Sequence, residues 1–185
     1  MRFILICILM IVAQMSWASK ILIPMDESQP NHLKAYGIAF WVLENNIEVE
    51  WLLNYRGGSF MIGNYPDIVS ECKIRGVGHQ ILADVQANSI YSEIANPEVN
   101  METVKLEVAP KVSVYSPKGK LPWDDAVTLV LTYAEIPYTV VYDEEIVRGD
   151  LPKYDWLHLH HEDFTGQYGK FYRSFRNAAW YQEEV

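Results

Sequence analysis

The chain shows the same pattern of apolar and polar positions twice. In the first copy, an apolar run over residues 21–25 precedes a helix-period segment from Pro30 to about Glu44 and a second apolar run over residues 48–55. In the second copy, strands at 112–115 and 138–142 flank a helix over 122–136. Because a helix that links two strands normally makes them parallel, both copies predict parallel, doubly wound, flavodoxin-like α/β units.

The remaining segments predict a division into two lobes. Residues 66–75 and 85–106 favour helix, and Ala109-Pro110 is the expected boundary between a lobe at 19–109 and a lobe at 110–185. A strand at 155–161 is the third and last strand predicted for the second lobe. A doubly wound sheet usually has about five strands. Since the second lobe supplies fewer, either its strands join the sheet of the first lobe or the chain is a fragment of a longer protein, and we expect the fragment.

The predicted helix of the first lobe has an apolar stripe that should face the core. Leu33, Tyr36, Phe40 and Leu43 recur at helical spacing. These four side chains are therefore expected to be buried.

Residues 1–18 have the pattern of a secretory signal peptide. A basic start at Arg2 precedes an apolar run over residues 3–12, and Ser16-Trp17-Ala18 places small residues where a signal peptidase cleaves. The apolar run is shorter than the roughly 20 residues that cross a bilayer. The mature chain is expected to begin at Ser19 and to lie in the periplasm or outside the cell, with no membrane span.

Charge and cysteine content restrict the partners of the mature chain. The formal net charge is −9, and removal of Arg2 with the signal peptide makes it −10. Such a balance disfavours nucleic acid and favours a small molecule or a protein as the ligand. Cys72 becomes the only cysteine, and its place within a predicted helix favours a packed or surface thiol over a nucleophile.

Two polar positions follow apolar runs in the first lobe. Asp26 comes directly after the first strand, and Arg56 precedes Gly57-Gly58 after the second. Glycine lets a backbone approach a ligand, and a guanidinium pairs with carboxylate or phosphate. Asp26 and Arg56 are therefore ligand-binding candidates, although a tight turn with a solvated arginine explains the second motif equally well.

The most chemically distinctive stretch is HLHHED, at the end of the third strand of the second lobe. His158 and His160 alternate onto one face, where they could hold zinc together with Asp163. The alternative is that His158 is a hydrogen-bonded core residue. His160, His161 and Glu162 are then the ligand-binding candidates at this strand end. The sequence contains no complete phosphate-binding loop, dinucleotide fingerprint or nucleophile elbow.

Several stretches across the whole chain resemble a family of exported Bacteroidetes proteins commonly labelled asparagine synthetase B. The label implies glutamine-dependent synthesis of asparagine, although Arg2 stands where glutamine-hydrolysing synthetases carry a cysteine. The stretches that carry the resemblance are ILIPMDESQPNHLKAYGIAFWVLE, WLLNYRGGSF, ECKIRGV, LPWDDAVTLVLTYAEIPY and YDWLHLHHEDFTGQYGKFY.

The second lobe is also similar to the start of class I glutamine-amidotransferase-like domains. Those domains place a glycine-rich turn after the third strand and a nucleophilic cysteine further along, whereas here the third strand runs into HHED and no cysteine follows. The resemblance implies a non-catalytic or divergent amidotransferase-like protein that binds a ligand or partner. A metal-assisted hydrolase using HLHHED is the first alternative, and a glutamine-dependent amidotransferase or asparagine synthetase is the second.

Overall fold

The computed structural model of the protein describes residues 19–116, 126–159 and 173–184. The chain divides into two compact units. The first comprises residues up to Ala109 together with Val130–Ile136, and the second comprises Pro110–Leu129 and the residues from Pro137 onward. The sequence-based division assigned residues 130–136 to the second lobe, whereas here they group with the first unit.

The first unit is built on a five-stranded antiparallel sheet. The strand order is β4-β1-β3-β2-β5, and each neighbouring pair runs antiparallel. The order β1-α2-β2-β3-α3-β4 is a split β-α-β arrangement, to which α4 and β5 are added. The strands are β1 (Ser19–Ile23), β2 (Val49–Leu53), β3 (Ser59–Gly63), β4 (Gln80–Ala83) and β5 (Glu102–Leu106). The helices are α2 (His32–Glu44), η1 (Tyr55–Gly57), α3 (Pro66–Ile74) and α4 (Asp84–Ile94).

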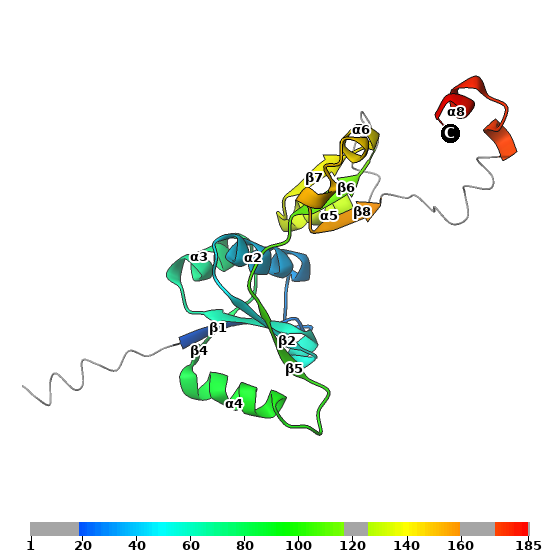
Figure 1. Cartoon of the computed structure of the whole chain (residues 1–185). Coiled ribbons are helices and arrows are strands. Elements are labelled where there is room, and N and C mark those ends of the chain that lie inside the picture. The colour runs from blue at the N-terminus through cyan, green and yellow to red at the C-terminus, as the bar shows by residue number, and fades with distance from the viewer. Residues whose placement is uncertain (1–18, 117–125, 160–172, 185) are drawn as a thin grey trace, which may run out of the picture. The chain divides into compact units, whose positions relative to one another are not determined.

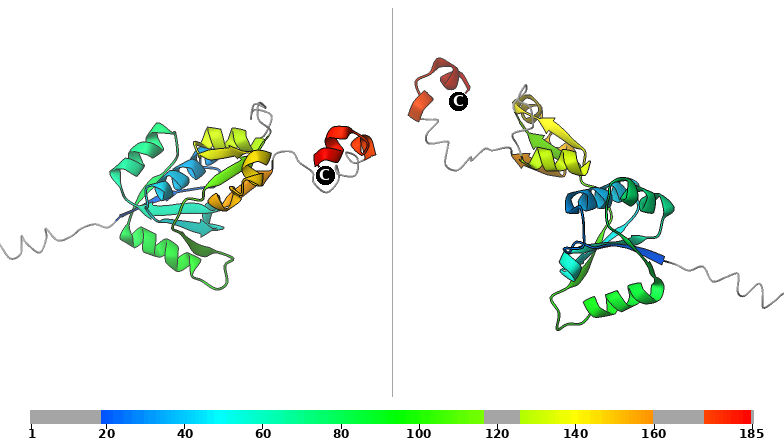
Figure 2. Two further views of the ribbon diagram at one scale, coloured as in Figure 1. Left: turned by 45° about the horizontal axis from the view of Figure 1, so that its top comes forward. Right: turned by 180° about the vertical axis from the view of Figure 1, so that it is seen from behind.

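Helices cover both faces of this sheet, so the unit has two cores. Figures 1 and 2 show α2 and α3 on one face and α4 on the other. Alternate residues of the same strand enter different cores: Ile21 and Ile62 pack beneath α2 and α3, whereas Leu22 and Met61 pack against α4. Four of the five β3 residues are buried because both faces of this strand are covered.

Helix α2 starts later than the sequence predicts and buries a different stripe. The Asn31 side chain caps the helix by accepting from the Lys34 amide at 3.1 Å, which leaves Pro30 outside the helix. Of the four predicted core residues, only Leu43 is buried; Leu33 and Tyr36 are 39% and 45% exposed, and Phe40 is half-buried. The buried stripe instead consists of Ala35, Ile38, Ala39, Val42 and Leu43, where small residues let the helix lie close to the sheet.

The prediction of parallel pairing is wrong for the first unit. Strands β1 and β2 were correctly recognised, but they are separated by β3, which runs against both. The sequence analysis predicted no strand over residues 57–84 and assigned residues 85–106 to helix. It therefore missed β3, β4 and β5. Helix α4 ends at Ile94 before the Asn96-Pro97 break, and the β-branched segment that follows forms β5 at the sheet edge.

The second unit contains a small parallel sheet, as predicted for that part of the chain. Strand β6 (Val112–Tyr115) lies between β7 (Tyr138–Val141) and β8 (Trp156–Leu159), and both pairs are parallel. Helix α5 (Ala126–Ala134) links β6 to β7. The remaining elements are α6 (Asp143–Val147), η3 (Leu151–Lys153) and α8 (Ala179–Glu184). The molecule is thus mixed α/β, with an antiparallel and a parallel sheet. Within the described ranges, no helix is both long and apolar enough to cross a membrane.

Candidate functional site

Asp26 and Arg56 lie together at one end of the antiparallel sheet, beyond the carboxyl ends of β1 and β2. Strands β1 and β2 run in the same direction because each is antiparallel to β3 between them, so their carboxyl ends lie at this same end. The Arg56 Nε donates to Asp26 Oδ2 at 2.6 Å, and Arg56 Nη2 donates to Ser28 Oγ at 3.1 Å. The sequence placed both residues at strand ends; the structure shows that they bind each other.

The backbone of this loop is held in an unusual conformation. Arg56 has φ 47° and ψ 47°, and Gly57 and Gly58 follow with φ of 83° and 92°. Arg56 is a non-glycine residue in the left-handed region, which costs free energy unless its surroundings fix it. Here the Met25 amide donates to the Arg56 carbonyl at 3.1 Å, and the Ser59 hydroxyl donates to the same oxygen at 3.3 Å.

Asp26 and Ser28 in the loop after β1 are thus bonded to Arg56 in the loop after β2, and we call this ion pair with its hydrogen bonds the clasp. Arg56 and Ser28 stabilise the ionised Asp26 carboxylate, whose Oδ1 also accepts from the Ser28 amide at 3.1 Å. The hydrogen bond from Arg56, followed by those from Ser28, lowers the pKa of Asp26 from 3.8 to about 2. The Asp26 carboxylate is thus occupied by donors from its own chain, which favours a structural role over ligand binding.

The clasp should make stability depend on pH in a defined window. Because the folded-state pKa of Asp26 lies below its unfolded value, the unfolded chain binds more protons, and the stabilisation is present above about pH 4 and lost as the pH falls toward 2. Asp26→Asn is expected to flatten the dependence of the urea midpoint on pH across this window. Glu27→Gln, at the exposed neighbouring carboxylate, is the matched control. Parallel midpoint curves for wild type and Asp26→Asn would contradict the prediction.

The histidine cluster of the second unit is only partly within the described residues. His158 lies in β8 opposite Val114 and is half-buried. His160, His161, Glu162 and Asp163 lie outside the described residues. Among the residues that the structure does describe, no three His, Cys, Asp or Glu side chains are grouped as a metal site would require. The zinc hypothesis therefore stays a prediction.

Cys72 lies within α3 and is fully buried. Burial raises the pKa of its thiol to about 11, and the nearby Glu71 carboxylate adds to this effect. A protonated, buried thiol is a poor nucleophile. Its position in a helix, away from any strand-to-helix elbow, agrees with the sequence-based interpretation.

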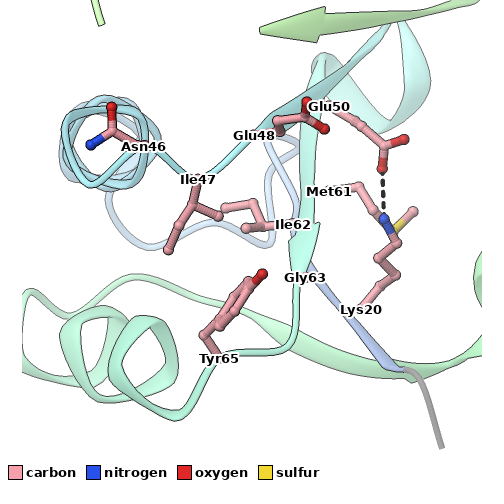
Figure 3. Close-up of a pocket in the computed structure, with 9 residues that line it drawn as sticks. All are labelled: Lys20, Asn46, Ile47, Glu48, Glu50, Met61, Ile62, Gly63 and Tyr65. Carbon is pink, nitrogen blue, oxygen red and sulfur yellow. Dashed lines mark hydrogen bonds and ion pairs between the residues drawn. The ribbon is translucent and has the colours of Figure 1, made fainter. Parts of the chain in front are cut away.

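A pocket of about 430 Å³ lies at the opposite end of these strands, where β1 and β2 begin and β3 ends (Figure 3). Its volume falls in the range typical of small-molecule sites. Figure 3 shows the paired Lys20 and Glu50 on one side of the end of β3 and Ile47 with Tyr65 on the other. The lining consists of Lys20, Asn46, Ile47, Glu48, Glu50, Met61, Ile62, Gly63 and Tyr65.

The strand register explains why these residues meet. Lys20 on β1 is the cross-strand partner of Gly63, and Glu50 on β2 is the partner of Met61. Lys20 Nζ donates to Glu50 Oε2 at 3.1 Å across the strand between them. The Tyr91 hydroxyl of α4 donates to the same oxygen at 2.5 Å. Burial and this carboxylate raise the pKa of Tyr91, so its hydroxyl stays a donor.

Gly63 and Tyr65 shape the other side of the pocket. A Cβ placed on Gly63 would lie 2.7 Å from Tyr65 Cε2, so the aromatic ring occupies the space that a larger residue 63 would need. Tyr65 is 47% exposed and precedes α3, whose first residue is Pro66. Among the described residues, the Tyr65 hydroxyl has no hydrogen-bond partner.

The sequence analysis missed this pocket because it predicted no strand at the position of β3. The available signal was the presence of Glu48 and Glu50 on one face of an otherwise apolar strand, where cross-strand partners of opposite charge are favourable. Their partners are distant in sequence: Lys20 is 30 positions from Glu50, and Lys105 is 57 positions from Glu48. Only the antiparallel pairing brings them together.

Comparisons with known proteins do not assign the chain to a family. No family model, no curated protein and no solved structure matches the chain.

Proposed function

We propose that the protein is an exported, non-catalytic binding protein whose first unit holds a small ligand in the pocket formed by Lys20, Glu48, Glu50, Gly63 and Tyr65. The observation that carries the proposal is this cavity of about 430 Å³, which is lined by both apolar and polar side chains. The clasp between Asp26 and Arg56 fixes the loops after β1 and β2 at the other end of the sheet, so we place ligand binding at the pocket end.

The signal-peptide pattern of residues 1–18 supports export, and the order of the parallel strands supports the divergent amidotransferase-like second unit. The strand order β7-β6-β8 is the order in which a flavodoxin-like sheet begins. N-terminal sequencing of the secreted protein should start at Ser19; an intact Met1 on protein recovered from the cytoplasm would contradict export.

The binding proposal is tested by titrating the purified protein with a mixture of small anionic, cationic and neutral polar molecules while recording ¹H–¹⁵N spectra. At least one class should shift the amide signals of Lys20, Glu50 and Gly63 and leave those of Asp26 and Arg56 in place. Gly63→Ala should weaken the response, because the added Cβ displaces the Tyr65 ring. The absence of any shift at the pocket with all three classes would refute the proposal.

The metal-assisted hydrolase and the glutamine-dependent amidotransferase are the alternatives that the sequence raised. The first depends on His160 and Asp163, which lie outside the described residues. Stoichiometric zinc in the purified wild-type protein, lost in a His158→Ala/His160→Ala double variant, would favour the hydrolase over the binding protein.

A further inference from the structure

The charges around the pocket balance one another. Lys20 pairs with Glu50 at 3.1 Å, and Lys105 of β5 pairs with Glu48 at 2.7 Å. In the part of the chain that the structure describes, each charged side chain of the pocket lining (Lys20, Glu48 and Glu50) is therefore paired with an opposite charge, and none is left unpaired to attract an ion. An ionic ligand would have to break one of these pairs or stay uncompensated, whereas a neutral polar ligand would not.

The pairs leave hydrogen-bonding capacity in both directions. Glu50 uses Oε2 for Lys20 and Tyr91, and Glu48 uses Oε1 for Lys105, so each carboxylate keeps a second oxygen as an acceptor. Lys20 keeps two of its three N–H donors. A hydroxyl group is a donor and an acceptor at once, so neighbouring hydroxyls match alternating acceptors and donors.

The aromatic wall completes the recognition chemistry. The Tyr65 ring is half-exposed beside Ile47, with its hydroxyl at hand to donate or accept (Figure 3). The face of an aromatic ring carries partial negative charge, so it attracts C–H groups that are polarised by neighbouring oxygens. A ring-shaped ligand with hydroxyl groups around its edge and C–H groups on its faces could therefore contact both the polar side chains and the Tyr65 ring.

We infer that the ligand of this pocket is a neutral saccharide unit, with its C–H face against Tyr65 and its hydroxyls on Lys20, Glu48 and Glu50. The inference rests on the proposed function and specifies its ligand class. Glu48 and Glu50 accept from the ligand hydroxyls through their second oxygens, and Lys20 donates to a hydroxyl oxygen.

The test compares sugars of similar size and different charge. Glucose, galactose and N-acetylglucosamine are the neutral probes, glucosamine is the cation and glucuronate is the anion; each is titrated into the purified protein under the ¹H–¹⁵N assay. At least one neutral sugar is expected to shift Lys20, Gly63 and Tyr65 with at least tenfold higher affinity than either charged sugar. Tyr65→Ala should weaken that binding at least tenfold, and Tyr65→Phe should weaken it less because the ring remains.

The controls separate the ligand class from the existence of a site. Tyr36→Ala removes a comparably exposed tyrosine from α2, outside the pocket lining, and should leave sugar affinity unchanged. Preferential binding of glucosamine or glucuronate would overturn the saccharide class and leave the binding function standing. If none of the five sugars shifts the pocket signals but another small molecule does, the saccharide class is likewise overturned and the binding function stands. If neither sugars nor the wider mixture shift these signals, the proposed function fails.

Discussion

Replacing Ile62 by alanine is expected to lower the free energy of unfolding of the first unit by about 3–4 kcal/mol. Ile62 lies in β3 and is 1% exposed beneath α2 and α3, so truncation removes buried apolar contacts and leaves a cavity in the core. The measurement is native-state hydrogen exchange of β3 amides as a function of urea, which reports on this unit alone.

Ile81 provides a matched control on the same row of the sheet. Ile21 pairs with Ile62 on one side and with Ile81 on the other, but Ile81 is on edge strand β4 and is 55% exposed. Ile81→Ala should therefore cost about 1 kcal/mol or less. Equal costs at the two positions would contradict the central place of β3 in the antiparallel sheet.

Gly57→Ala is expected to destabilise the first unit by about 2–5 kcal/mol, because two costs add. Gly57 has φ 83°, a conformation that strains any residue with a Cβ. In addition, the new Cβ would lie 2.3 Å from the Met25 carbonyl oxygen, and the clash is with backbone, which has little freedom to move away. Hydrogen exchange of β1 and β2 amides again gives the free energy.

Gly76→Ala separates these two costs. Gly76 has φ 69°, but a Cβ there would meet no atom within 4 Å. The variant carries only the conformational cost and should lose about 1 kcal/mol. Should Gly57→Ala be no worse than Gly76→Ala, the close packing of the loop after β2 against Met25 would be refuted. Packing against Met25 would then not be what holds Arg56 in position for the clasp.

The sequence by itself determined the local elements with a strong periodic signal. Strands β1, β2, β6, β7 and β8 and the cores of α2, α3 and α5 follow apolar runs and helical spacing, which depend on neighbouring residues only. The strand-end positions of Asp26 and Arg56 were predicted for the same reason, because each marks the point where an apolar run turns polar.

Only the tertiary structure decided the pairing of the strands and, with it, the pocket. A helix between β1 and β2 suggested parallel neighbours, but β3 inserted between them and reversed the pairing. Strand β3 gave little warning, because burial on both faces removes the alternation that identifies a strand. The meeting of Lys20 with Glu50, and of Asp26 with Arg56, depends on that insertion. Contacts between residues about 30 positions apart are set by sheet register, which no local pattern in the sequence encodes.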